Sequence, residues 1–285
     1  MMTSLGFLLV LAAAACHAVW NFFVKQINAG PELVWLFSLL TIVIYSPLAA
    51  WFLWQGPALD PTALGFIFAS CLIHLGYFLL LQQGYRKGEL SIVYPTARAT
   101  GPMLSTLFSI AFLNDHASLQ GVAGGLVIIF GVFMLSGGIG TMKGNAAQSL
   151  RFGIGAGLMI GSYTVWDAYT VSVLMVPPLL LDYASSLGRV MLLAPIAAKR
   201  KTDVKRLWRE HKGPVFVIAL FNPLAYILVL VAMTFTPVSY VAPIREISVV
   251  LSVLLGSLVL GEGQLGRRLA LALVILAGVS VLATS

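Results

Sequence analysis

The stretch LGFLLVLAAAACHAVWNFFV, residues 5–24, sets the fold class of this chain. It contains no charged residue, and a helix of this length crosses the hydrocarbon core of a bilayer, which is about 30 Å thick. No basic residue precedes it, it is too long for the apolar core of a signal peptide, and His17 and Asn21 interrupt it. We therefore expect a membrane-spanning helix that is retained.

The rest of the chain continues this pattern. Of its 285 residues, 59% are hydrophobic and 9% are charged, whereas soluble domains carry about 25% charged residues. We predict an all-α polytopic membrane protein with about ten transmembrane helices. The predicted spans cover residues 4–24, 32–54, 62–84, 90–113, 119–138, 152–172, 179–198, 214–235, 239–260 and 267–284.

The basic residues indicate the topology. All but three of the 17 lysines and arginines lie in the connections that follow odd-numbered spans. The positive-inside rule makes these connections cytoplasmic, and it places both termini on the non-cytoplasmic side of the cell inner (plasma) membrane. The net charge of +7 is then a topology signal, so we expect no nucleic-acid partner. The basic segment KRKTDVKRLWREHK, residues 199–212, is predicted to be a solvated loop, with contact to anionic lipid as the alternative.

No motif indicates a cofactor or a metal ion. The four histidines are scattered and no P-loop sequence occurs. Cys16 and Cys71 both fall inside predicted spans, so they suggest no disulfide framework. We predict a protein without cofactors that is not an enzyme.

The second half of the chain repeats the first. SYTVWD, residues 162–167, echoes CHAVWN, residues 16–21, and further features recur in the same order at offsets of 146–148 residues. Five spans per copy is an odd number, so the second copy must cross the membrane in the opposite sense, as in many secondary transporters. We predict two inverted five-helix repeats, at 1–140 and 152–285, joined by a linker loop at 141–151. The matched positions are Trp20 with Trp166, Pro47 with Pro195, His74 with Asn222, Pro95 with Pro243, and Asp115 with Glu262.

A set of short motifs accompanies the duplication. HAVWN, at residues 17–21, is followed by Lys25, and the fourth span joins a run of small residues to Pro95. Asp115 follows that span, and the fifth span reads GVAGGLVIIFG. In this order, and repeated in the second half, the motifs resemble EamA-type members of the drug/metabolite transporter superfamily over nearly the whole chain. The resemblance implies secondary transport of small metabolites, often export.

Two polar helix faces are candidates for a solute site. They comprise His17, Trp20 and Asn21 in the first copy and Tyr163, Trp166 and Asp167 in the second. Each set has the spacing i, i+3, i+4, which lies on one face of a helix. A polar face inside a membrane must turn toward protein or a wet cavity. Hydrogen bonding between helices and cavity lining are both open for His17 and Asn21, whereas the charge of Asp167 favours the cavity.

Charged residues inside spans are the second set of candidates, because each costs about 2.5–3.5 kcal/mol at a helix centre. Arg98 and Arg245 follow prolines, which loosen the backbone beside them. In a continuous helix Arg245 and Glu246 point about 100° apart, so at most one faces the cavity. The structural alternative is an internal ion pair such as Arg98–Glu246. For Asp182 and Arg189, which share a face of one span, we expect a structural role.

Aromatic and amide residues in register with these groups complete the predicted site. We expect Trp20 and Trp166 to face a shared central cavity, with Asn21 and Asp167 close by and the charges of spans four and nine on the opposing wall. The predicted substrate-binding residues are His17, Trp20, Asn21, His74, Tyr77, Tyr94, Arg98, Tyr163, Trp166, Asp167, Asn222, Tyr226, Arg245 and Glu246.

These features predict a secondary active transporter that works by alternating access, with proton coupling or exchange. Arginines together with acids suit a small polar metabolite, amino-acid-like or otherwise zwitterionic or anionic. The alternatives are an exporter of hydrophobic cations or drugs, which tryptophans would suit through cation–π contact, and an integral-membrane enzyme or a non-transporting scaffold. The expected partners are the solute and the lipid bilayer. Glycine runs allow close helix packing in a monomer or a homodimer.

Overall fold

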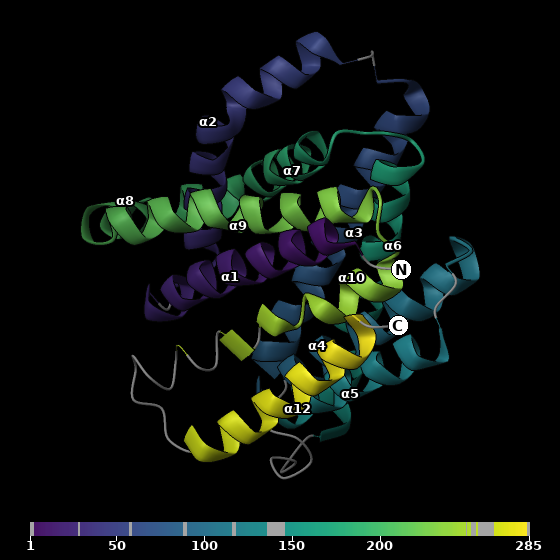
Figure 1. The fold of residues 1–285 in the computed structure, drawn as a ribbon. Helices are drawn as coiled ribbons and strands as arrows, with labels where there is room; N and C mark the ends of the chain where they lie inside the picture. The colour runs from purple at the N-terminus through teal and green to yellow at the C-terminus, as the bar shows by residue number, and fades with distance from the viewer. Residues whose placement is uncertain are drawn as a thin grey trace.

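A computed structural model of the chain describes residues 3–27, 29–56, 59–87, 90–115, 118–135, 146–248, 250–251, 255 and 265–283. Within these ranges every regular element is an α-helix (Figure 1). The helices are α1 (Ser4–Ile27), α2 (Pro31–Gln55), α3 (Pro61–Lys87), α4 (Leu90–Phe112), α5 (Leu119–Leu135), α6 (Ala146–Ser172), α7 (Pro178–Lys199), α8 (Lys201–Glu210), α9 (Lys212–Met233), α10 (Val238–Ile244) and α12 (Leu265–Ala283).

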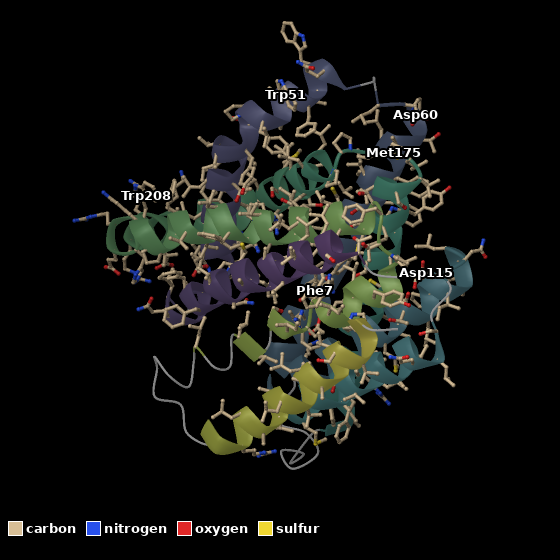
Figure 2. All side chains as sticks on the ribbon, viewed as in Figure 1. Phe7, Trp51, Asp60, Asp115, Met175 and Trp208 are labelled. Carbon is tan, nitrogen blue, oxygen red and sulfur yellow. The ribbon has the colours of Figure 1, made fainter. Side chains whose placement is uncertain are left out.

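Five of the described helices, α1, α2, α3, α7 and α9, are long and apolar enough to cross a membrane. Large apolar side chains such as Leu8, Val43 and Leu273 are exposed on the outer surface, where they would meet lipid. Connections also alternate between the two ends of the bundle: Asp60, Asp115 and Met175 lie toward one end and Trp208 toward the other (Figure 2). The prediction of an all-α multi-pass membrane protein is confirmed.

The packing of the helices follows the internal repeat. In the predicted correspondence, α1 matches α6 and α3 matches α9. The structure packs α1 extensively against α9, and it packs α6 extensively against α3. The first helix of each copy therefore packs on the third helix of the other copy. This is the pattern expected when a pseudo-twofold axis relates the two repeats.

Matched helices of the two copies run antiparallel. Gln120, at the start of α5, donates from Nε2 to the carbonyl oxygen of Val281 at the end of α12 (3.2 Å). Glu32, at the start of α2, pairs with Arg200 just beyond the end of α7. The helices of the second copy thus run in the opposite direction to their counterparts in the first copy. This is the arrangement of an inverted repeat, so this part of the fold prediction is confirmed.

Glycines bring α4 and α6 into close contact. A Cβ added at Gly153 would lie 2.6 Å from Cβ of Thr96, and one added at Gly157 would lie 2.6 Å from Cβ of Thr100. Both distances are below van der Waals contact, so a larger residue here would push the helices apart. The glycine run of α6 therefore serves packing within one chain.

The structure corrects two predicted elements. The segment predicted as a solvated loop at 199–212 contains the helix α8. The predicted span 239–260 is interrupted, because α10 ends at Ile244 and a turn at Arg245 and Glu246 follows. Pro243 lacks the N–H of a regular helix, and the turn is closed by a short-range bond from the Glu246 nitrogen to the Pro243 oxygen (3.0 Å). Arg245 and Glu246 thus sit at a helix break.

The predicted linker at 141–151 is partly helical, since α6 begins at Ala146. Its remaining residues lie outside the described part of the chain.

Candidate functional site

Asp167 is the centre of a buried polar cluster between α3, α6 and α9. Its side chain is fully buried, and its Oδ1 accepts a hydrogen bond from the Ser70 hydroxyl (2.5 Å). Its Oδ2 accepts from the Tyr226 hydroxyl (2.5 Å) and lies 2.9 Å from Nε2 of His74. A buried carboxylate is costly unless hydrogen bonds replace its water, and here three partners do so. We call Asp167, Ser70, His74 and Tyr226 the aspartate cluster.

Aromatic rings enclose the aspartate cluster. The His74 ring stacks on Tyr163 with centroids 4.0 Å apart and planes at 23°. Tyr226 meets His74 edge-on at 5.6 Å, and Tyr77 meets Tyr163 edge-on at 5.8 Å. These contacts fix the rings, so the carboxylate sits in an aromatic setting of the kind that also attracts cations.

A second buried cluster lies at the helix break after α10. Nη2 of Arg98, on α4, lies 2.8 Å from Oε2 of Glu246, and Nε of Arg245 lies 4.0 Å from Oε1 of the same carboxylate. Arg98 also donates to the Ser248 hydroxyl (3.3 Å). The Arg98–Glu246 pair that the sequence raised as a structural alternative is therefore present. We call Arg98, Arg245, Glu246 and Ser248 the arginine cluster.

The arginine cluster is less completely bonded than the aspartate cluster. Arg245 is 7% exposed, and within the described part of the chain its Nε and Nη2 have no hydrogen-bond partner. Glu246 is fully buried, and its carboxylate meets the arginines at ion-pair distances without the angles of a hydrogen bond. A buried donor without an acceptor costs about 1–3 kcal/mol, and more when charged. An anionic group placed beside Arg245 would remove that cost.

The two clusters belong to one region of the molecule. Tyr163 lies within electrostatic range of Asp167 as well as of Arg98, Arg245 and Glu246. His17, on α1, lies within range of Arg98 and Arg245. Residues of both repeats thus converge here, as expected for the midplane site of an inverted-repeat fold.

The two tryptophans make separate contacts. Nε1 of Trp166 donates to the carbonyl oxygen of Phe66 on α3 (2.9 Å), and the two rings stack with centroids 4.3 Å apart. Nε1 of Trp20 donates to Nδ1 of His17 (3.2 Å), and Trp20 packs on the apolar cluster that contains Leu33. For Trp166 this geometry matches the hydrogen-bonding alternative between helices. A shared cavity for the two indoles stays a prediction.

The remaining predicted residues are less informative. Asn21 and Asn222 are partly buried on α1 and α9, which pack together. The side chain of Tyr94 lies outside the described residues.

Three site residues were not among the predicted ones. Ser70 lies four residues before His74, and Ser248 lies three after Arg245, so helical spacing from a polar candidate could have found the first. Asp182, on α7, is 5% exposed and lies within electrostatic range of Arg189, and also of His74 and Asp167. Its proximity to Arg189 is what the expected structural role requires.

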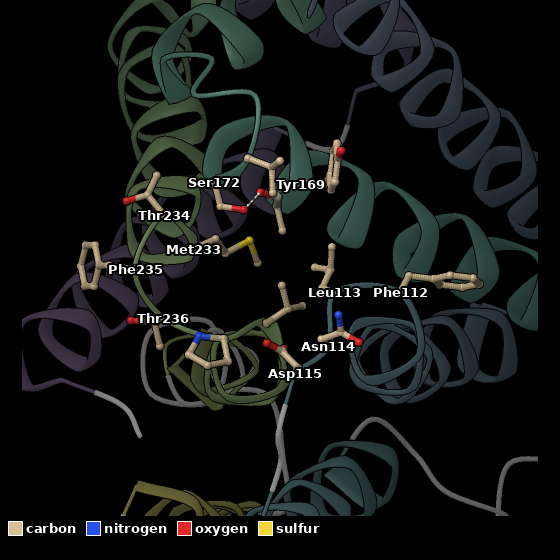
Figure 3. A pocket seen from close by; sticks show the side chains of 14 residues that line it. Phe112, Leu113, Asn114, Asp115, Tyr169, Ser172, Met233, Thr234, Phe235 and Thr236 are labelled. Atoms are coloured by element: carbon tan, nitrogen blue, oxygen red, sulfur yellow. Dashed lines mark hydrogen bonds between the residues drawn. The ribbon is translucent and has the colours of Figure 1, made fainter.

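A cavity of about 450 Å³ lies beside this region, between the ends of α4, α6 and α9 and the start of α10 (Figure 3). Ala168, the neighbour of Asp167, lines it together with Ser172 from the next turn. Asp115 is at its rim, where Oδ2 accepts a hydrogen bond from the backbone nitrogen of Ser239 in the first turn of α10 (3.1 Å). The helix that carries Asp167 and the short helix that precedes Arg245 thus both contribute residues to the wall of the cavity.

Known proteins share this architecture. A solved structure described only as "Crystal structure of protein" has the same fold, with a TM-score of 0.77 and 18% identity over 99% of this chain and 96% of that chain. The EamA-like transporter family model matches residues 4–137 and, separately, residues 149–284. Because the family model matches both halves and nearly the whole length, the chain belongs to the EamA-like transporter family.

Proposed function

We propose that the chain is a secondary active transporter that moves a small zwitterionic or anionic metabolite by alternating access. The observation that carries the proposal is Arg245, a buried guanidinium at a helix break whose Nε and Nη2 have no hydrogen-bond partner among the described residues. Family membership supports transport as the activity, and it speaks against the enzyme and scaffold alternatives.

The arginine cluster would bind the anionic end of the solute. A guanidinium presents paired donors that match a carboxylate or phosphate. Among the described residues two arginines flank the one carboxylate of Glu246, so Glu246 balances only part of their charge. The solute's acidic group would therefore complete the charge balance as well as the hydrogen bonds of Arg245.

The aspartate cluster would respond to the other end of the solute. Asp167 and the rings of His74 and Tyr226 suit an ammonium group, through charge and through cation–π attraction. The Asp167–His74 contact also joins two groups that can exchange a proton, which would allow solute movement to be coupled to protons. Protonation of Asp167 would weaken its hold on an ammonium group.

Alternating access requires an element with two arrangements, and the break after α10 is the candidate. Pro243 removes a helix hydrogen bond, so the segment that carries Arg245 and Glu246 can bend at low cost. Binding of the solute to these side chains would stabilise one arrangement over the other, which is the condition for a ligand-driven shift.

The competing function is export of hydrophobic cations, which the aromatic rings around Asp167 favour. The charges of partly buried Arg98 and buried Arg245 disfavour it, because like charges repel in a region of low dielectric constant. We further propose that the protein resides in the inner (plasma) membrane with both termini outside. Reporter fusions at the C-terminus and within α8 should then give opposite signals.

Uptake into proteoliposomes tests the function. The purified chain should accumulate labelled zwitterions or carboxylates under an imposed proton gradient, and it should not accumulate hydrophobic cations. A panel of solutes that differ in one charged group would separate the two ends of the site. Accumulation of cations alone would contradict the proposal and support the drug-export alternative.

A further inference from the structure

Helix α8 (Lys201–Glu210) joins α7 and α9, both of which are candidate membrane spans, so it lies at the membrane surface. It packs back on the bundle through Leu207, which is buried against residues at the ends of other helices, including Leu33 of α2 and Val215 of α9. Arg200, just before α8, is tied to Glu32 by an ion pair of 2.9 Å. The orientation of α8 on the bundle is therefore fixed by contacts on one side.

The charges of α8 are divided between two faces. Lys201, Lys205 and Trp208 have the spacing i, i+4, i+7, and Arg209 extends the same side. All four side chains are exposed. We call these four residues the basic face. It contains three positive charges and no acidic residue.

The opposite side of α8 balances its own charge. Asp203, Arg206 and Glu210 have the spacing i, i+3, i+7 on another face. Arg206 and Asp203 form an ion pair of 3.0 Å within this face. Both acids of α8 are thus removed from the lysines, so the basic face has no acidic partner on its own helix.

Trp208 indicates the kind of surface that the basic face contacts. Trp208 is 39% exposed, and it lies at the far end of the molecule from Asp115 (Figure 2). An exposed indole among lysines is unfavourable in water, whereas tryptophan is favoured at the level of lipid headgroups. Lysine and arginine side chains at the same level extend toward anionic headgroups, each contributing about 1 kcal/mol near such a surface.

We propose that the basic face of α8 binds the headgroups of anionic phospholipids and anchors the connection between α7 and α9 to the membrane surface. This goes beyond the transport function, because it concerns a surface at the end of the bundle rather than the solute site. The occupant is the bilayer itself: the face is convex, exposed and flanked by two spans, which suits a lipid surface better than a single enclosed phosphate.

The test is competition between lipids on the full-length chain. The protein in detergent is mixed with equal amounts of phosphatidylglycerol and phosphatidylcholine of different acyl mass, and native mass spectrometry measures the ratio of bound lipids. Lys205→Gln should lower the preference for phosphatidylglycerol about five-fold. Lys201→Gln, Lys205→Gln and Arg209→Gln together should abolish it. Because these side chains are exposed, the melting temperature should stay unchanged.

Arg206→Gln is the matched control, since it removes the same charge from the neighbouring residue on the balanced face. It should leave the lipid ratio unchanged. An equal loss in Lys205→Gln and Arg206→Gln, or no preference for phosphatidylglycerol in the unmodified chain, would overturn the proposal. Displacement of the lipid by millimolar glycerol phosphate or by polyglutamate would also overturn it, because the face would then bind soluble anions.

Discussion

The aspartate cluster and the arginine cluster each hold a buried charged group, yet among the described residues only Asp167 has hydrogen bonds to all its charged atoms, whereas Arg245 does not. Asp167 has three partners, one on Oδ1 and two on Oδ2. Arg245 has an acid 4.0 Å away and no hydrogen bond to its Nε and Nη2 among the described residues. A satisfied cluster stabilises the fold, whereas an unsatisfied one stores a cost that a ligand can relieve. Variants in which folding stability and solute binding are measured separately test this contrast.

The largest loss of stability should come from Arg98→Ala. The substitution leaves Glu246 fully buried without its closest positive partner, and breaking a buried pair in this way costs about 3–5 kcal/mol. Unfolding in detergent, followed by circular dichroism, measures the change. The double variant Arg98→Ala with Glu246→Gln should recover part of the loss. If the single variant is as stable as the unmodified chain, the ion pair does not support the fold.

Asp167→Asn should cost less, about 1–3 kcal/mol in unfolding free energy, because the amide keeps the shape but weakens the charge-assisted bonds to Ser70 and Tyr226. The same variant should also lose the dependence of uptake on a proton gradient, while counterflow exchange without a gradient continues with a lower affinity for solutes that carry an ammonium group. Unchanged proton dependence would remove Asp167 from the coupling step and leave it a structural role.

Trp166→Phe should cost about 0.6 kcal/mol, the typical value of one hydrogen bond between membrane helices. The substitution removes the bond to the Phe66 carbonyl and keeps most of the ring stacking. Solute affinity, measured by isothermal titration, should be unaffected. A large loss of affinity at normal stability would show that the indole lines the solute site.

The smallest effect on stability is expected for Arg245→Gln, which removes a poorly satisfied buried charge and should leave the melting temperature unchanged or slightly raised. Solute affinity should nevertheless fall about ten-fold to one hundred-fold, since a charged hydrogen bond contributes about 1.5–3 kcal/mol. Arg206→Gln, on the surface of α8, controls for the loss of one positive charge. Retained affinity in Arg245→Gln would contradict the assignment of the arginine cluster to the solute.

Much of the candidate site could be named from the sequence as isolated residues, and their role in solute binding stays a prediction. Helical spacing identified His17, Asp167 and Tyr226, and the cost of charge inside a membrane identified Arg98 and Glu246. Their partners were not visible. Nothing in the sequence distinguishes Ser70 from other serines, because its bond to Asp167 depends on which face of α3 packs against α6. The sequence likewise left open whether the indole of Trp166 faces a cavity or, as found, bonds to a carbonyl oxygen of the neighbouring helix.

The membrane-spanning character of the helices, their approximate number and the inverted repeat follow from the amino-acid sequence alone, because hydrophobicity, span length and internal similarity are properties of local segments. The three-dimensional packing was needed to show that the ninth span breaks at Arg245, that the basic connection forms α8, and that, among the described residues, Asp167 is fully hydrogen-bonded while Arg245 is not. These outcomes depend on how helices rotate and cross, which determines the partner that each buried polar group reaches.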